Sequence, residues 1–132
     1  MTLLDLTPRV TVADRLSTLP VAIIGAGPIG LAAAANLVER GIDFILFESG
    51  DEIAACVRAW GHTRLFSPWK HLVDPASPRL LEETGWELRD PDRAPTGTEL
   101  VDKYVARLAA LHEIASRIRT GVEVIGVTRE GM

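Results

Sequence analysis

The residues in this sequence with the clearest chemical potential are three glycines, Gly25, Gly27 and Gly30, spaced Gly-x-Gly-x-x-Gly. The first glycine permits a tight turn, the second lets a phosphate approach the main chain, and the third allows a helix to pack closely. The free N–H groups and the positive end of such a helix would bind a diphosphate. We therefore predict a dinucleotide site here, which includes the intervening residues Ala26, Pro28 and Ile29.

A carboxylate follows the glycine motif at a useful distance. Glu48 comes after the apolar run 43–47, and an acid about 20 residues beyond the glycines is the usual acceptor for ribose hydroxyls. Its neighbour Ser49 is included in the predicted site. The alternative is a surface glycine turn with a solvated glutamate. Strand, turn, helix, second strand and acid follow one another in the expected order, which favours the dinucleotide site.

The apolar pattern predicts the elements that hold these groups. A strand at 21–24, a helix from 28 to about 40 that stops at Gly41, and a second strand at 43–47 form a β-α-β unit. Such a unit needs a parallel sheet with a right-handed crossover. We therefore expect an α/β fold of the Rossmann type, with residues 1–19 as a lead-in and residues 20–132 as the domain.

The second half of the chain is less regular. Prolines and all three tryptophans fall within 49–95, where only 79–84 is predicted to be helical. Thr96 and Glu99 have the spacing of a capping box, which predicts that a helix begins there. Its apolar face would carry Val101, Tyr104, Val105 and Leu108. The alternating residues 122–128 predict a third strand.

The composition of the chain limits the kinds of partner that it is expected to bind. The chain has 132 residues, 47% of them apolar and 24% charged, which is typical of one soluble domain. Its net charge of −4 and lack of a basic cluster argue against nucleic acid and anionic membranes. The apolar run 20–38 contains glycines and prolines, so we do not expect it to span a membrane. The lone Cys56 indicates a reducing cytoplasm, and no spacing of ligands predicts a metal site.

Four segments of the sequence have counterparts in one family: Ile23–Ala32, Phe47–Asp51, Trp60–Trp69, and Thr98–Tyr104 followed by Ile118–Val124. Through them the sequence resembles the FAD- and NAD(P)H-dependent flavoproteins that include flavin-containing and Baeyer–Villiger monooxygenases. The resemblance implies FAD as cofactor, NAD(P)H as cosubstrate, and adenine held against Val124.

The sequence departs from that family in two ways. Ala54 and Ala55 stand where many relatives carry a Gly-Gly pair. Relatives are also several times longer, with a second glycine-rich motif for NAD(P)H. We therefore expect a truncated, amino-terminal FAD-binding segment that is inactive by itself, and an unpaired sheet edge that favours self-association.

Other reactive side chains have unremarkable explanations. Cys56 has no second cysteine nearby, so we expect a buried structural thiol. His62 has no partner carboxylate in view, and no catalytic residue is assigned. Trp60 and Trp69 could either wall a flavin or hold the loop against the domain. Arg58 and Arg64 could face phosphates or the carbonyl edge of a flavin, but we expect both to be solvated.

Three functions stay open on the sequence alone. The first is the FAD-binding segment of an NAD(P)H-dependent flavoprotein oxidoreductase, possibly a monooxygenase in type. The second is a dinucleotide-binding module without catalysis. The third is an NAD(P)-binding dehydrogenase domain, because zinc alcohol dehydrogenases share Gly-Ala-Gly-Pro-x-Gly-Leu. In those enzymes a metal-binding catalytic domain precedes the motif, whereas 24 residues precede Gly25 here.

Overall fold

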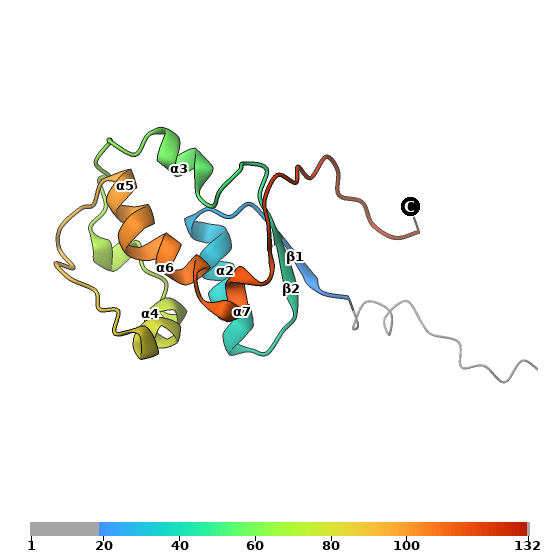
Figure 1. Ribbon diagram of the computed structural model, residues 1–132, viewed down its shortest axis with the longest axis horizontal. Coiled ribbons are helices and arrows are strands. Elements are labelled where there is room, and N and C mark those ends of the chain that lie inside the picture. The colour runs from blue at the N-terminus through green and yellow to red at the C-terminus, as the bar shows by residue number, and fades with distance from the viewer. Residues whose placement is uncertain (1–18, 132) are drawn as a thin grey trace, which may run out of the picture.

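A computed structural model describes residues 19–131 of the chain. The predicted lead-in, apart from its last residue, lies outside the described residues. The described part contains a parallel three-stranded sheet in the order β1-β2-β3. Figure 1 shows the helices gathered on one side of strands β1 and β2. The predicted α/β fold of the Rossmann type is therefore confirmed.

The β-α-β unit forms as the sequence predicts. Strand β1 (Val21–Ile24) pairs in parallel with strand β2 (Phe44–Phe47), and helix α2 (Pro28–Glu39) makes the crossover between them. Parallel neighbours cannot be joined by a tight hairpin, so a helix of this length is needed. The helix ends where Arg40 donates its N–H to the Asn36 carbonyl, 3.2 Å away. The next residue, at position 41, is a glycine with φ of +65°.

The third strand lies earlier in the chain than the sequence predicts. Strand β3 is Ile118–Arg119, and it pairs in parallel with Leu46 and Phe47 at the end of β2. The prediction of a strand at 122–128 is wrong. Strand β2 ends at Phe47, so it offers no ladder for the later residues. The side chains of Ile125 and Val127 are 94% and 83% exposed.

The segment 49–95 contains more helix than the sequence predicts. It holds helix α3 (Ala55–Ala59), helix α4 (Ala76–Leu81) and the 3₁₀ turns η1 (Trp69–His71) and η2 (Glu82–Thr84). The predicted helix at 79–84 covers only the end of α4 and all of η2. Both α-helices are six residues or shorter. Elements this short have too few turns to show a 3.6-residue apolar period.

The predicted capped helix forms in three consecutive pieces, which are helix α5 (Gly97–Leu100), the π-helical turn η3 (Val101–Val105) and helix α6 (Ala106–Ala109). Helix α7 (His112–Ala115) follows after a break at Leu111, whose backbone is extended. Thr96 caps the start, because its hydroxyl oxygen accepts from the Glu99 N–H at 3.1 Å. The predicted apolar face is confirmed, since each of its members is at most 1% exposed: Val101, Tyr104, Val105 and Leu108.

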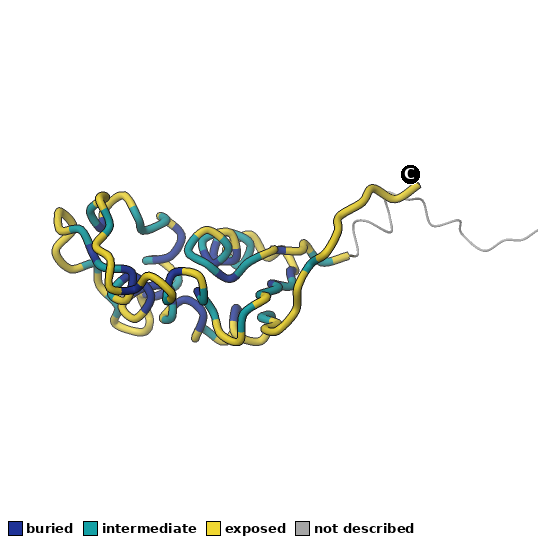
Figure 2. The backbone as a smooth tube through the Cα atoms, turned by 90° about the horizontal axis from the view of Figure 1, so that it is seen from above, coloured by how far each residue is buried: buried dark blue, intermediate teal, exposed yellow. Residues whose placement is uncertain are grey.

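The core lies between the sheet and the helices. Ile23 and Leu46, which are opposite one another in β1 and β2, are buried against α2, where Leu31 is fully buried. The opposite face of the sheet is more open, and Ile24 is 58% exposed there. Figure 2 shows the buried backbone concentrated among the helices and the exposed carboxyl-terminal segment extending away from them. Among residues 19–131, no helix combines the length and apolar character that crossing a membrane requires.

A buried polar cluster ties α2, α4 and η3 together. The Tyr104 hydroxyl donates to the Ser77 hydroxyl at 2.9 Å and accepts from the Asp74 N–H at 3.2 Å. The Asp74 carboxylate accepts from the Asn36 side chain on α2 at 3.0 Å and from the Ala76 N–H at 2.9 Å. Burial raises the pKa of Tyr104, so its hydroxyl keeps its proton and can donate. This cluster fixes the helical layer behind the glycine turn.

Candidate functional site

The glycine turn joins β1 to α2 with very little space between them. Gly25 has φ of +99°, a conformation that side chains with a Cβ rarely adopt. A Cβ at Gly30 would lie 1.9 Å from the Gly25 carbonyl oxygen, so only glycine fits at this position. The first turn of α2 therefore packs directly against the turn that precedes it. Pro28 lies in that first turn, as the sequence predicts.

The mouth of α2 presents free N–H groups. Within residues 19–131, the N–H groups of Gly27, Ile29 and Gly30 have no hydrogen-bond acceptor. A Cβ at Gly27 would have no atom within 4 Å, so the space over the turn is open. Free N–H groups and the positive end of a 12-residue helix together favour an anion. The turn has the properties of a phosphate cradle.

Glu48 points at this turn. One of its carboxylate oxygens accepts from the Ala26 N–H at 3.0 Å, and the other accepts from the Gly50 N–H at 2.7 Å. A carboxylate has about four lone-pair sites, so each oxygen can accept one further hydrogen bond. The side chain is therefore held in place by the main chain and keeps acceptor capacity for two hydroxyl groups.

The carboxyl-terminal segment completes the site. The N–H groups of Gly121 and Val122 donate to the carbonyls of Gly50 and Glu48, both at 2.9 Å. These bonds bring Val124 beside the glycine turn, although residues 122–128 form no strand. The resulting cavity has a volume of about 430 Å³, within the usual range for small-molecule sites. It is lined by Ile24, Gly25, Gly27, Phe47, Glu48, Ser49, Ala54, Cys56, Val57, Val122, Glu123 and Val124.

Most of the predicted site residues meet in or at this cavity. Five of the nine line it directly: Gly25, Gly27, Glu48, Ser49 and Val124. Ala26 is fully buried below it and takes part through its N–H group. The remaining three lie in the first turn of α2 and contribute main chain rather than side chain, and the side chain of Ile29 is 84% exposed. They are Pro28, Ile29 and Gly30.

Helix α3 adds residues that the sequence analysis missed. Ala54 and Val57 are buried, whereas Cys56 between them is exposed and lines the cavity. The prediction of a buried structural thiol is therefore wrong, because α3 turns Val57 inward and Cys56 outward. The sequence holds no clear signal for this helix, because five residues are too few to show an apolar period. Ala54, at the place of a glycine in many relatives, has φ of +55° and donates its N–H to the Ala26 carbonyl.

The two candidate tryptophans hold the loop rather than line this cavity. Trp69 is 5% exposed, and its ring meets that of Tyr104 edge to face at 6.5 Å. Trp60 covers Gly97 so closely that a Cβ there would lie 2.8 Å from its ring. His62 is exposed and also does not line the cavity.

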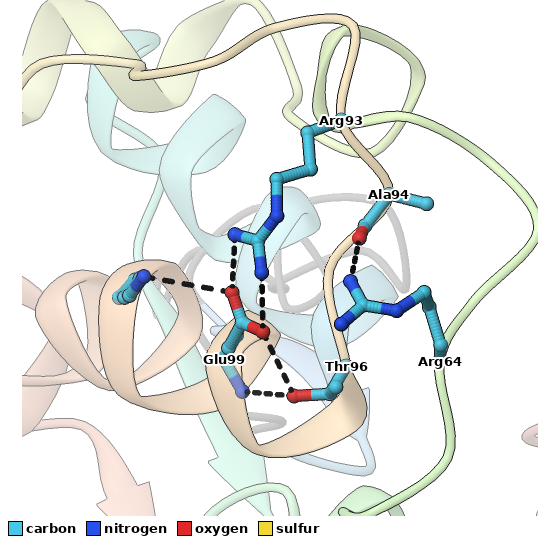
Figure 3. A network of polar contacts seen from close by, with 6 residues as sticks. Arg64, Arg93, Ala94, Thr96 and Glu99 are labelled. Atoms are coloured by element: carbon cyan, nitrogen blue, oxygen red, sulfur yellow. Dashed lines mark hydrogen bonds and ion pairs between the residues drawn. The ribbon is translucent and has the colours of Figure 1, made fainter.

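The two arginines expected to be solvated both have partners in the protein. Arg58 forms ion pairs with Glu52 at 3.4 Å and with Asp102 at 3.5 Å. Arg64 donates to the carbonyl of Ala94 at 2.6 Å, as Figure 3 shows. Arg64 is exposed, as the sequence predicts, whereas Arg58 is only partly exposed, with 33% of its side chain accessible. Neither guanidinium lines the cavity at the glycine turn.

Solved structures share this fold. A steroid monooxygenase bound to NADP is 22% identical with a TM-score of 0.58, and the match covers 76% of this chain and 19% of that one. OTEMO in an FAD-bound form is 21% identical with a TM-score of 0.58, and the match covers 82% of this chain and 20% of OTEMO. The bacillithiol disulfide reductase Bdr (YpdA) from Bacillus cereus is 23% identical with a TM-score of 0.60. The match covers 85% of this chain and 31% of the reductase.

The chain thus spans between 19% and 31% of the length of these three proteins. A comparison with curated proteins gives no match. The profile of the family described as pyridine nucleotide-disulphide oxidoreductase matches residues 22–132, which include the glycine turn, Glu48 and Val124. The chain belongs to the pyridine nucleotide-disulphide oxidoreductase family.

Proposed function

We propose that this chain is the FAD-binding segment of an NAD(P)H-dependent flavoprotein oxidoreductase. The observation that carries the proposal is the cavity in which a helix mouth, an anchored carboxylate and the segment 122–124 meet. Each of these three features matches one part of an adenosine diphosphate group. The diphosphate would lie on the helix mouth, the ribose on the carboxylate, and the adenine against the segment.

The main chain would neutralise the diphosphate. The cavity is lined by Glu48 and Glu123 and by no basic side chain. The three free N–H groups, at Gly27, Ile29 and Gly30, are therefore the donors for the phosphate oxygens, aided by the helix dipole. A diphosphate diester suits such a cradle, because its charge is lower than that of a nucleotide with an additional phosphate.

Glu48 selects the kind of ribose. Its carboxylate can accept from the two ribose hydroxyls through the lone pairs that the Ala26 and Gly50 N–H groups leave free. A 2′-phosphate at the same place would meet a negative charge and find no donor. This argument favours FAD or NAD over NADP at this cavity, and it leaves NAD(P)H to a second site.

The resemblance favours FAD over NAD. The motifs at Phe47–Asp51 and Trp60–Trp69 resemble those of flavoproteins, and the fold is shared with OTEMO in its FAD-bound form. FAD, when bound, supplies the redox chemistry, while the protein binds and orients it. We propose a monooxygenase-like flavoprotein rather than a dithiol reductase, because no second cysteine follows Cys56 within the few residues that a reactive disulfide at this place would need. A single cysteine also suits a reducing cytoplasm, which we propose as the location.

A dinucleotide-binding module without catalysis is the second candidate. It is favoured by the cavity itself, whose groups bind rather than react: the free N–H groups at the helix mouth and the Glu48 carboxylate. We expect the 132 residues by themselves to bind the dinucleotide and not to oxidise NAD(P)H. A steady-state assay of NAD(P)H oxidation with oxygen or a dye tests this expectation, and turnover by this chain would exclude the module without catalysis.

The test of FAD binding is a direct titration. The protein is refolded with excess FAD, free cofactor is removed, and flavin absorbance that elutes with the protein is measured. Affinity is then compared among FAD, FMN and NAD. FMN lacks the adenosine half, so we expect it to bind much more weakly than FAD.

Two variants complete this titration. Glu48→Gln should weaken FAD binding, because the amide offers one acceptor oxygen instead of two. Glu113→Gln makes the same chemical change on the exposed surface of α7 and should leave the affinity unaltered. Equal affinity for FMN and FAD, or equal loss in both variants, would exclude the proposed site.

A further inference from the structure

A second cavity lies on the other side of the helical layer, between the loop 84–93 and the helical segment 103–111. Its volume is about 660 Å³, and it shares no lining residue with the cavity at the glycine turn. It is lined by Trp69, Leu81, Thr84, Gly85, Trp86, Glu87, Leu88, Arg89, Asp90, Arg93, Lys103, Arg107, Ala110 and Leu111.

Basic side chains outnumber acidic ones in this lining, although the chain as a whole is acidic. Its acidic members are Glu87 and Asp90. Its basic members fall into two groups that differ in their partners, and they are Arg89, Arg93, Lys103 and Arg107.

The first group is already paired. Arg93 donates to both oxygens of Glu99, at 2.8 Å and 3.0 Å, and Lys103 lies 3.5 Å from the same carboxylate. Figure 3 shows how Arg93 reaches this carboxylate at the start of α5. One glutamate thus faces two cations, and the guanidinium of Arg93 holds the pKa of Glu99 below its usual range.

The second group has no partner. Within residues 19–131, the side chains of Arg89 and Arg107 make no hydrogen bond or ion pair, and the acids Glu87 and Asp90 engage neither of them. Arg107 lies four residues after Lys103 and so on the same side of the helix. Guanidinium groups bind carboxylates and phosphates through paired N–H donors. The cavity therefore carries unused anion-binding capacity.

An apolar wall adjoins these cations. The Trp86 side chain is half-buried and fixed, because its indole N–H donates to the Lys103 carbonyl at 2.7 Å. Its ring lies 5.9 Å from that of Tyr104, which also meets the buried ring of Trp69. Leu81, Leu88, Ala110 and Leu111 complete the apolar part of the lining. A rigid aromatic wall beside free cations is suited to a ligand that has one apolar end and one anionic end.

We propose that this cavity is a second ligand site, which binds a small molecule with an oxyanion on an apolar body. Arg89 and Arg107 bind the oxyanion, and Trp86 contacts the body. The inference is independent of the proposed FAD site, because the two cavities share no residue. Carboxylates and phosphates both present the oxyanion that these guanidinium groups bind, and the test distinguishes between the two.

The test uses the ¹⁵N-labelled full chain, titrated separately with benzoate, phenyl phosphate and benzamide. The indole N–H signal of Trp86 is assigned from its loss in Trp86→Phe. We expect a saturable shift of this signal with at least one of the two anions, and the stronger of them identifies the preferred oxyanion. Benzamide, which has the same ring and no charge, should cause a much smaller shift. Equal shifts with benzamide, or no saturable shift with any probe, would overturn the proposal.

Two variants test the role of the cations. Arg107→Gln and Arg89→Gln should each lower the affinity for the effective anion by roughly fivefold, since each removes a charge-assisted bond at an exposed site. Arg129→Gln removes the same charge from the exposed carboxyl-terminal segment and should leave the affinity unchanged. The spectrum of each variant shows whether it is folded. Unchanged affinity in both cavity variants, or an equal loss in Arg129→Gln, would contradict the assignment.

Discussion

Two substitutions within one glycine motif should have opposite consequences. Gly30→Ala should destabilise the protein, whereas Gly27→Ala should leave it stable and weaken its binding of the dinucleotide. Each change adds one methyl group, and the two positions are three residues apart. The surroundings of the added Cβ differ. At position 30 it would meet the main chain of Gly25, whereas at position 27 it would meet no atom within 4 Å.

The size of the Gly30→Ala effect follows from the geometry. The new Cβ would lie 1.9 Å from the Gly25 carbonyl oxygen, about 1.5 Å short of an ordinary contact. The obstacle is main chain in a turn that already has φ of +99°, so no side-chain rotation relieves the overlap. Overpacking typically costs 1–3 kcal/mol, and we expect about 3 kcal/mol here. With a urea dependence of about 1–3 kcal/mol per M, the unfolding midpoint should fall by about 1–3 M.

Gly27→Ala is the matched control for stability. Gly27 has φ of −88° and ψ of −171°, which alanine adopts without strain, so the free energy of unfolding should change by about 1 kcal/mol or less. Its methyl group would occupy the space proposed for the diphosphate and should weaken FAD binding about tenfold or more. Urea unfolding and FAD titration measure both quantities. A stable Gly30→Ala protein, or a Gly27→Ala protein that binds FAD as the wild type does, would refute the reasoning.

Three further predictions concern other parts of the chain. The guanidinium of Arg93 lowers the pKa of Glu99 below the usual range of a glutamate, so the stabilisation from this pair is complete above about pH 5 and is lost as the pH falls through the folded-state pKa. The difference in urea stability between wild type and Glu99→Gln should therefore shrink in acid, and a difference that grows would contradict this. Cys56 lines the proposed FAD site, so FAD should slow its alkylation by iodoacetamide, and an equal rate would place the cofactor elsewhere. Tyr104→Phe leaves the buried Ser77 hydroxyl without its donor and should cost about 1–2 kcal/mol in urea unfolding; no change would show that the bond contributes nothing.

The β-α-β unit was predictable because its determinants are local. The glycine spacing, the apolar runs and the stop at Gly41 all lie within 30 residues, and each agrees with the others. The position of Glu48 beside the turn also follows from local rules, since the carboxyl end of β2 lies next to that of β1. Spacing alone therefore placed the glycine turn and the Glu48 carboxylate together.

The third strand was not predictable from its own residues. Alternation at 122–128 favoured a strand there, but pairing requires a partner, and β2 ends at Phe47. The two residues that do pair, Ile118 and Arg119, are too few to show a pattern. Helix α3 is also short, and with it the exposure of Cys56 was missed. In each case the contacts that decide the structure come from residues far away in the sequence.

The most direct test of the account follows main-chain amides at the mouth of α2 while ADP is added. In ¹⁵N–¹H spectra, the signals of Gly27, Ile29 and Gly30 should shift in a saturable manner with ADP, because their N–H groups have no other acceptor within residues 19–131. Adenosine, which lacks the phosphates, should leave these three signals nearly unchanged. If ADP shifts none of them, or shifts only signals remote from the turn, the helix mouth is not a diphosphate site and the proposed function fails.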